Sequence, residues 1–229
     1  MKRHKVLLFL LMIGFTLICT ACSIKNISSD DYVKNIETIV DRTSKYTNTN
    51  AIGYQYYLPN GVTVSEVNDF NQKLYSHGEN YYLYADVVSY YHNVYSPYEE
   101  DEDAFISKKI EKNGIQGYVE VNETDGKYFI EMMFNYAKVE SLVKKENLKD
   151  ALNNIAYILT SIKYNDDIIE NLLGEKKYNL SDSETYNIFK TKKTTNDNFL
   201  KYDEEYGKYD GDEAVDLIEK KEINQDKDN

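Results

Sequence analysis

Three segments of the chain repeat apolar residues every three or four positions, which is typical of amphipathic helices. The first covers residues 29–44 and begins at a Ser-Ser-Asp N-cap signal. The longest covers residues 147–164, with apolar positions at Leu148, Ala151, Leu152, Ile155, Ile158, Leu159 and Ile162. A third, shorter helix is expected over residues 166–173, ended by Gly174. The two longer helices each have one continuous apolar face that requires a partner layer.

The region between these two helices is rich in aromatic and β-branched residues, which favour strands. Strand-prone segments are expected at residues 52–58, 62–64, 70–75, 81–95, 105–110, 117–121 and 127–143. Turn signals are found at residues 59–61, 113–114 and 125–126, and in a five-residue hairpin loop at residues 76–80. Within the fourth of these segments, residues 81–91 alternate little, as expected of a central strand covered on both faces. The chain is therefore expected to be α+β, with a mostly antiparallel sheet of five or six strands packed by amphipathic helices in two layers.

The amino-terminal segment has the pattern of a secretion signal. Three basic residues precede an apolar run of 13 residues, Val6 to Ile18. A bilayer-spanning helix requires about 20 apolar residues, so this run is short for a permanent anchor. Small Thr20 and Ala21 then precede Cys22 and a polar segment. This arrangement resembles the bacterial lipoprotein signal, in which the cysteine is lipidated and becomes the first residue after cleavage.

The resemblance implies that residues 1–21 are removed, that Cys22 is lipidated, and that residues 22–28 tether the protein to the outer face of the cell membrane. Two alternatives stay open, an uncleaved signal anchor and a secretory peptide cut after Ala21. Since Cys19 is removed and Cys22 is lipidated, no disulfide is expected in the mature chain. The bias toward Asn, Lys, Ile and Tyr is typical of a low-GC genome, such as that of a clostridium-like Gram-positive bacterium.

A change in composition near residue 190 separates the expected α+β domain, residues 29–190, from the rest of the chain. Near the end of this domain, Ser181 and Glu184 have the spacing of a capping box. Residues 200–229 then contain 11 acidic and 5 basic side chains. So little apolar surface does not offset the entropy of ordering, so residues 191–229 are expected to form an acidic, mostly mobile tail with one weak helix near residues 215–218.

The net charge of −12 opposes binding to phosphate backbones, and nucleic acid is not expected as a partner. The acidic run at residues 99–103 could offer oxygen ligands to Ca²⁺, but it lacks the glycine of an EF-hand loop, so a solvated loop is favoured. His77 and His92, the histidines of the mature chain, belong to no catalytic or zinc-binding motif. We expect no catalytic residue, no metal and no cofactor. Paired carboxylates of a glycoside hydrolase stay open, because 39 acidic residues allow many pairs.

Two phrases of the sequence carry a resemblance to a known fold. The segment GYQYYLPNGVTV at residues 53–64 and the helix end ILTSIKYN at residues 158–165 resemble the Mog1/PsbP-like fold. That family opens with an aromatic strand into a Pro-x-Gly-Trp turn, and Val62 stands here where the family has Trp. The resemblance covers about residues 50–165 and implies a non-enzymatic binding or assembly role. A second resemblance, to lipoprotein-carrier-like domains, including those of spore-germination lipoproteins, stays open.

Tyrosine is the most unusual feature of the composition, with 23 tyrosines and no tryptophan. Eleven fall within the predicted sheet region, at positions 54, 56, 57, 75, 81, 82, 84, 90, 91, 95 and 98. An aromatic body with a polar tip suits protein interfaces and stacking on sugars. The same residue is also a good strand former, which explains its enrichment without any binding role. The candidate binding residues are Tyr54, Tyr56, Tyr82, Tyr84 and Tyr91.

Together, these patterns favour a lipid-anchored, extracytoplasmic binding or assembly protein of the cell envelope. It would be non-catalytic and would present a Tyr-rich sheet surface to a protein partner. One alternative is a glycan-binding or wall-active hydrolase module, in which the tyrosines stack on sugar rings. Another is the solute receptor of a transporter, although a two-lobed receptor usually requires a longer chain.

Overall fold

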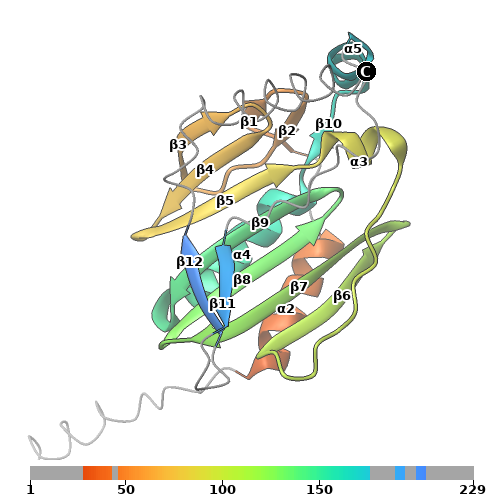
Figure 1. Ribbon diagram of the computed structural model, residues 1–229. Helices are drawn as coiled ribbons and strands as arrows, with labels where there is room; N and C mark the ends of the chain where they lie inside the picture. Colours follow the sequence, from red (N-terminus) through yellow and green to blue (C-terminus); the bar gives the residue numbers. More distant parts are fainter. Residues whose placement is uncertain (1–27, 43–45, 176–188, 194–199, 205–229) are drawn as a thin grey trace, which may run out of the picture.

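The computed structural model describes residues 28–42, 46–175, 189–193 and 200–204, and its centre is a seven-stranded antiparallel sheet (Figure 1). The strands are β3 (Thr63–Asn68), β4 (Asn71–Ser76), β5 (Glu79–Ala85), β6 (Ile106–Lys112), β7 (Ile115–Thr124), β8 (Lys127–Phe134) and β9 (Ala137–Lys144). They are arranged in the order β3-β4-β5-β9-β8-β7-β6. Two meanders, β3 to β5 and β6 to β9, therefore meet where β9 pairs with β5.

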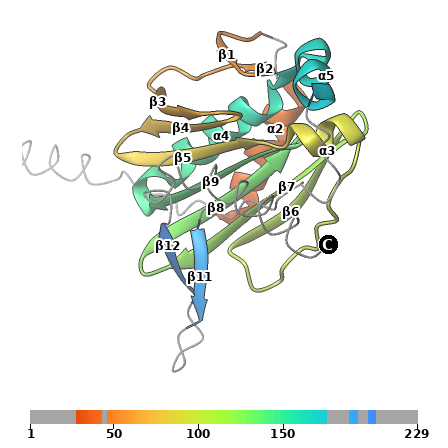
Figure 2. The same ribbon diagram turned by 45° about the horizontal axis from the view of Figure 1, so that its top comes forward.

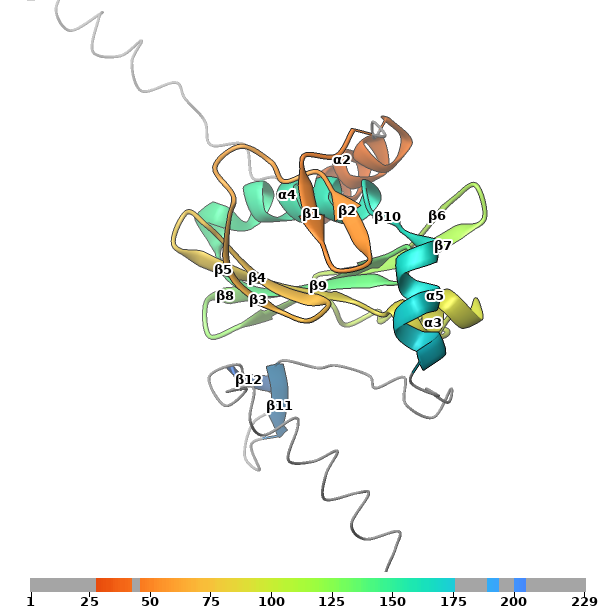
Figure 3. The same ribbon diagram turned by 90° about the horizontal axis from the view of Figure 1, so that it is seen from above.

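Two amphipathic helices cover one face of this sheet, as Figure 3 shows. They are α2 (Ser29–Arg42) and α4 (Leu148–Thr160), which pack on each other, and α4 also contacts β8 and β9. The apolar stripe of α4 is buried against the sheet, where Ile155 meets a layer that includes Ile130 and Val139. The helices expected at residues 29–44 and 147–164 are confirmed in their main parts, but α4 ends at Thr160, and Lys163 and Tyr164 form a strand. Residues 43 and 44 lie outside the described part of the chain. The third forms α5 (Asp166–Glu175), which includes Gly174 instead of ending before it.

Most hairpins of the large sheet use tight turns of two residues that both have positive φ. His77 and Gly78 have φ of 51° and 84°, and Ser76 pairs directly with Glu79. The expected five-residue loop at residues 76–80 is therefore wrong, because two residues in the left-handed region suffice to connect twisted strands. Asn135 and Tyr136 form a turn of the same kind, with φ of 53° and 59°.

The expected strands at residues 127–143 and 81–95 each prove to be two elements. The turn at Asn135 and Tyr136 divides residues 127–143 into β8 and β9. The other segment is a strand only as far as Ala85 and continues as the short helix α3 (Val87–His92). The carboxylate of Asp86 caps this helix by accepting a hydrogen bond from the Ser89 amide at 2.8 Å. This cap overrides the β propensity of the aromatic and β-branched residues in α3.

Two smaller sheets complete the fold. β1 (Thr49–Ala51), β2 (Tyr54–Tyr56) and β10 (Lys163–Tyr164) form a three-stranded sheet in the order β1-β2-β10. The pairing of β10 with β2 holds residues 46–59 beside the end of α4. Nearby, α3 and α5 contact each other at one end of the large sheet (Figure 2).

A hairpin of β11 (Phe189–Lys193) and β12 (Leu200–Glu204) lies on the face of the large sheet opposite α2 and α4 (Figures 1 and 3). These strands occupy part of the segment that was expected to be a mobile tail. The predicted capping box at Ser181 and the weak helix near residues 215–218 lie outside the described residues. The α+β class and the mostly antiparallel sheet are confirmed, whereas five or six strands is too few and the hairpin adds to the expected two layers.

Candidate functional site

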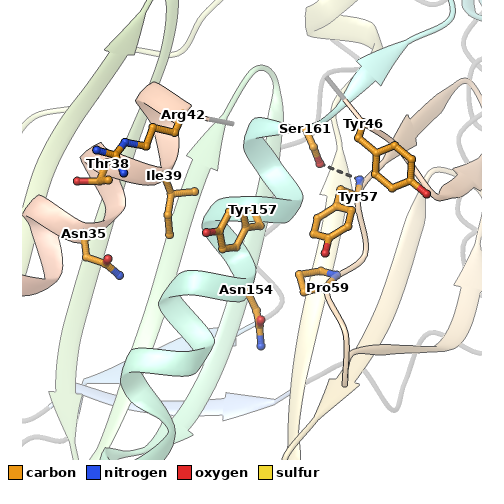
Figure 4. A pocket seen from close by; sticks show the side chains of 10 residues that line it. All are labelled: Asn35, Thr38, Ile39, Arg42, Tyr46, Tyr57, Pro59, Asn154, Tyr157 and Ser161. Atoms are coloured by element: carbon orange, nitrogen blue, oxygen red, sulfur yellow. Dashed lines mark hydrogen bonds between the residues drawn. The ribbon is translucent and has the colours of Figure 1, made fainter. Parts of the chain in front are cut away.

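A groove between α2, α4 and the segment of residues 46–59 is the best candidate for a functional site. It has a volume of about 660 Å³, which falls within the usual range of about 300–1,000 Å³ for small-molecule sites. Its lining residues, drawn in Figure 4, are Asn35, Thr38, Ile39, Arg42, Tyr46, Tyr57, Pro59, Asn154, Tyr157 and Ser161. We call it the α2–α4 groove.

The α2 wall of the groove follows from the amphipathic pattern of that helix. Ile36 and Val40 are buried toward the core, which places Thr38 and Arg42 on the side that borders the groove. Arg42 is the last residue of α2, where the helix dipole favours a cation. The Asn35 side-chain amide donates a hydrogen bond to the Asn153 side-chain oxygen, which ties α2 to α4.

Three tyrosine rings line the groove. Tyr57 and Tyr157 have ring centroids 6.4 Å apart and an angle of 79° between their planes, and Tyr46 lies 6.0 Å from Tyr57 at 58°. Tyr46 is 63% exposed and Tyr157 is 41% exposed. The Tyr57 amide donates a hydrogen bond to the Ser161 hydroxyl at 2.8 Å (Figure 4), which fixes this segment to the end of α4. The three rings therefore form an angled aromatic surface that solvent and a ligand can reach.

The polar groups of the groove are amides, hydroxyls and one guanidinium. None of the described residues that line the groove is acidic, although the whole chain has 39 acidic residues. The Asn154 side chain also hydrogen-bonds the hydroxyl of buried Tyr81, whose pKa is raised by burial. The groove can thus offer hydrogen bonds and one positive charge, and among the described residues it contains no carboxylate that could act as general acid or base.

Three of the five candidate binding tyrosines are buried, which contradicts their expected place on an interaction surface. Tyr54 is 1% exposed, Tyr56 is 0% exposed and Tyr82 is 1% exposed. Tyr54 donates a hydrogen bond to the Phe70 carbonyl at 2.8 Å, and Tyr56 donates one to the Gln72 side chain. Burial raises the pKa of both Tyr54 and Tyr56 well above the usual range. These two rings support the fold by packing while their hydroxyls are satisfied inside.

The other two candidates are more accessible but lie apart. Tyr84 is half-buried in β5, and Tyr91 is exposed in α3, where its ring contacts His92. Tyr157, which sequence reasoning missed, belongs to the groove instead. It lies outside the apolar repeat of α4, and an aromatic residue on the polar side of an amphipathic helix is the signal that could have identified it.

A cluster of carboxylates occupies the sheet face opposite α2 and α4. Glu120 pairs with Glu131, and Glu131 with Glu140, on three neighbouring strands. The Tyr118 hydroxyl donates to Glu131, and Lys138 Nζ lies 2.6 Å from Glu140 Oε1. Burial, then the negative charge of Glu131, raises the pKa of Tyr118 well above the usual range. The Glu131 and Glu140 carboxylates are thereby engaged by groups of the chain itself.

The acidic run at residues 99–103 folds back on β6. Glu100 accepts a hydrogen bond from the Lys109 amide at 2.9 Å and lies 3.5 Å from Lys108 Nζ. The backbone amide of Lys109, followed by the charge of Lys108, lowers the pKa of Glu100. Within the described residues, no group of three or more His, Cys, Asp or Glu side chains is placed to hold a metal ion.

The two histidines lie beyond opposite ends of β5. His77 is in the turn before this strand, with its Nδ1 3.0 Å from the Ser76 hydroxyl, and His92 ends α3. Both are exposed, and the structure does not bring them together. Cys22 lies outside the described residues. In the described part of the chain, no helix has the length and hydrophobicity required to cross a bilayer.

Comparison of the chain with known protein families, with curated proteins and with solved structures finds no match.

Proposed function

We propose that this protein is a lipid-anchored, extracytoplasmic binding protein of the cell envelope, with the α2–α4 groove as its ligand site. The observation that carries the proposal is the groove itself, of about 660 Å³, with three tyrosine rings and several hydrogen-bonding side chains. Rigid aromatic side chains provide a large contact area at low entropic cost. The groove thus takes the place of the Tyr-rich sheet as the proposed interaction surface.

The groove lies toward the end of α2 that is farther from the proposed anchor. The tether of residues 22–28 can span at most about 25 Å when extended. From Ser29, α2 leads toward Arg42 over 14 residues, a rise of about 21 Å. Figure 1 shows that α2 starts at the lower end of the domain and runs upward along the sheet. A lipidated Cys22 would therefore hold the groove within several tens of ångströms of the membrane, where envelope ligands are within reach.

The side chains of the α2–α4 groove and of the carboxylate cluster on the opposite sheet face favour a binding function over catalysis. In the part of the chain that the structure describes, the lining of the groove contains no acidic side chain, and the Glu131 and Glu140 carboxylates contact Tyr118 and Lys138. A glycoside hydrolase requires two carboxyl groups on either side of a bound sugar. The resemblance to the Mog1/PsbP-like fold, which implies a non-enzymatic role, also supports a binding function, by analogy alone.

The anchor is tested by metabolic labelling with a radioactive fatty acid. The wild-type protein should incorporate label and remain in the membrane fraction. The Cys22→Ala variant should lose the label and leave the membrane, because the acceptor sulfur is absent. Continued labelling of Cys22→Ala would refute the lipidation of this residue.

The binding site is tested by photo-crosslinking in living cells. Tyr157 in the groove is replaced by p-benzoylphenylalanine, and Tyr75, which is 47% exposed on β4, receives the same replacement as a matched control. A ligand in the groove should give an adduct from position 157 and none from position 75. Digestion of the adduct with proteases or with wall hydrolases then shows whether it contains protein or glycan. Equal adducts from both positions, or none from position 157, would contradict the proposed site.

A further inference from the structure

We infer that the α2–α4 groove binds an acidic saccharide, meaning a short glycan that carries a carboxylate. This inference deepens the proposed function and rests on it. It assigns the carboxylate to Arg42, the sugar ring to the tyrosines, and the hydroxyl groups of the sugar to the neutral polar side chains of the groove.

Arg42 is the strongest indication of an anionic ligand. The chain has 27 basic residues, of which two are arginine, Arg3 and Arg42. Arg3 falls within the predicted signal peptide, so the mature chain would have a single arginine, and it lines the groove. Guanidinium offers a planar pair of donors that matches a carboxylate, which the ammonium group of lysine does not. Lysine would serve equally well as a solvated surface charge.

The surroundings of Arg42 leave its charge available to a ligand. Among the described residues, no carboxylate lies within ion-pair distance of this guanidinium. Among the described residues that line the groove, none besides Arg42 is charged, in a chain whose net charge is −12. The groove therefore has the opposite charge to the molecule as a whole, and complementary charge selects an anionic ligand over a cationic one.

The arrangement of the aromatic rings suits a saccharide. Tyr57 and Tyr157 are nearly perpendicular, at 79°, so a sugar that stacks on the face of one ring meets the edge of the other. The 41% exposure of Tyr157 leaves ring surface for the apolar C–H face of a pyranose. Tyrosine also combines this apolar surface with a hydroxyl that can hydrogen-bond a sugar.

Neutral hydrogen-bonding groups provide the third element of recognition. Asn35 and Asn154 present amides, each a donor and an acceptor, and Thr38 presents a hydroxyl. The Asn35 contact with Asn153 and the Asn154 contact with Tyr81 hold these amides in place before a ligand arrives. Saccharide hydroxyls both donate and accept, so fixed amides are suitable partners and lose little entropy on binding.

The test measures binding of defined saccharides to the full chain, purified in detergent, by isothermal titration calorimetry. Two acidic probes are used, a tetragalacturonate and a muropeptide with free carboxylates, because the carboxylate could belong to a uronic acid or to a wall peptide stem. Chitotetraose serves as the neutral probe. We expect at least one acidic probe to bind about 10-fold or more tighter than chitotetraose, since a charge-assisted hydrogen bond contributes at least this factor.

Three variants test whether the saccharide probes bind in the α2–α4 groove. Arg42→Gln should remove the preference for the acidic probe, a loss of about 10-fold or more in its affinity. Lys34→Gln makes the same change of charge at an exposed position of α2 that does not line the groove, and it should leave both affinities unchanged. Tyr157→Leu should weaken the acidic and the neutral probes by similar factors. Increasing salt should weaken the acidic probe alone.

Equal binding of acidic and neutral probes, no binding of any probe, or an acidic preference that survives Arg42→Gln would each overturn the inference. The crosslink from position 157 separates this failure from a failure of the proposed function. If position 157 still gives a specific adduct that contains protein and no glycan, the groove is a binding site for another class of ligand. If position 157 gives no adduct and no probe binds, the proposed function fails as well.

Discussion

The two faces of the large sheet differ in polarity, although they are formed by neighbouring residues of the same strands. Toward α2 and α4, a continuous row crosses six strands through Gln72, Leu83, Val139, Met132, Val119 and Lys108. On the other face, the row one residue away consists of Lys73, Tyr82, Glu140, Glu131, Glu120 and Ser107. The first row is apolar in its centre, whereas the second has three consecutive glutamates.

Like charges directly opposite each other on neighbouring strands are destabilising, so the second face requires compensation. Lys138 lies 2.6 Å from Glu140 and 3.8 Å from Glu131. Tyr98 donates a hydrogen bond to Glu120 at 2.7 Å, and its ring stacks on Tyr118 at 4.0 Å. The helix-covered face is therefore stabilised by the exclusion of water from apolar side chains, and the opposite face by a network of ion pairs and hydrogen bonds whose members depend on one another.

The largest expected effect is on the helix-covered face. Ile155 of α4 is fully buried against the sheet, so Ile155→Ala should lower the free energy of unfolding by about 3 to 4 kcal/mol through lost burial and a cavity. Urea unfolding at pH 7 measures this change. A loss below about 1 kcal/mol would show that α4 does not pack closely on the sheet.

The next effect is on the opposite face. Lys138→Met should lower the free energy of unfolding by about 2 to 3 kcal/mol, because it removes the cation beside Glu140, which is 1% exposed. The double variant Lys138→Met with Glu140→Leu should recover most of this loss, since it removes the buried charge together with its partner. If the double variant is as unstable as the single one, the Lys138 side chain acts by packing and not by its charge.

A smaller effect is expected for Tyr118→Phe, which removes the hydroxyl that donates to Glu131. The free energy of unfolding should fall by about 1 to 2 kcal/mol at pH 7. Burial and the Glu131 charge hold the pKa of Tyr118 above its unfolded value, so its contribution is complete below about pH 10 and is lost as the pH rises further.

The pH dependence provides the control for this prediction. Stability of the wild-type protein should decline above about pH 10, because tyrosines ionise in the unfolded state before they do so in the folded state. The decline should be shallower in Tyr118→Phe, because this variant lacks the hydroxyl whose pKa is raised in the folded state. Urea unfolding between pH 8 and pH 11 measures both proteins, and identical slopes in the wild type and in Tyr118→Phe would contradict the assignment.

The smallest effect is expected at the edge of the sheet. Glu66 is 56% exposed and lies 3.3 Å from Lys73 Nζ. Glu66→Gln should change the free energy of unfolding by less than about 0.5 kcal/mol, because an exposed ion pair is screened by water. A loss above about 1 kcal/mol would place this pair among the cooperative interactions of the second face.

The sequence predicted those elements whose signal is local. The apolar repeat that includes Ile155 identified α4, and the Asn113-Gly114 and Asp125-Gly126 pairs identified turns, since few other residues adopt positive φ so readily. The turn at Tyr136 gave no such signal, because a tyrosine with positive φ is uncommon. The composition of helix α3 favours a strand, and only its N-cap residue Asp86 indicates a helix.

The candidate site was largely beyond sequence reasoning. Tyr54 and Tyr157 are chemically identical residues, yet one is buried in the core and the other lines the groove. The groove also brings Arg42 and Ser161 together from positions more than a hundred residues apart. Only the packing of α2 on α4 and the pairing of β10 with β2 determine these neighbours.

The α+β class, the longer helices and most of the short turns can thus be predicted from local sequence, because they depend on periodicity and on the backbone preferences of neighbouring residues. The order of the strands, the burial of particular tyrosines and the position of the groove depend on the three-dimensional packing of the chain. These features depend on contacts between residues distant in the chain. A tyrosine side chain is stable both in the core and at the surface of a groove, provided that its hydroxyl has a hydrogen-bond partner, so its position cannot be predicted from its chemistry alone.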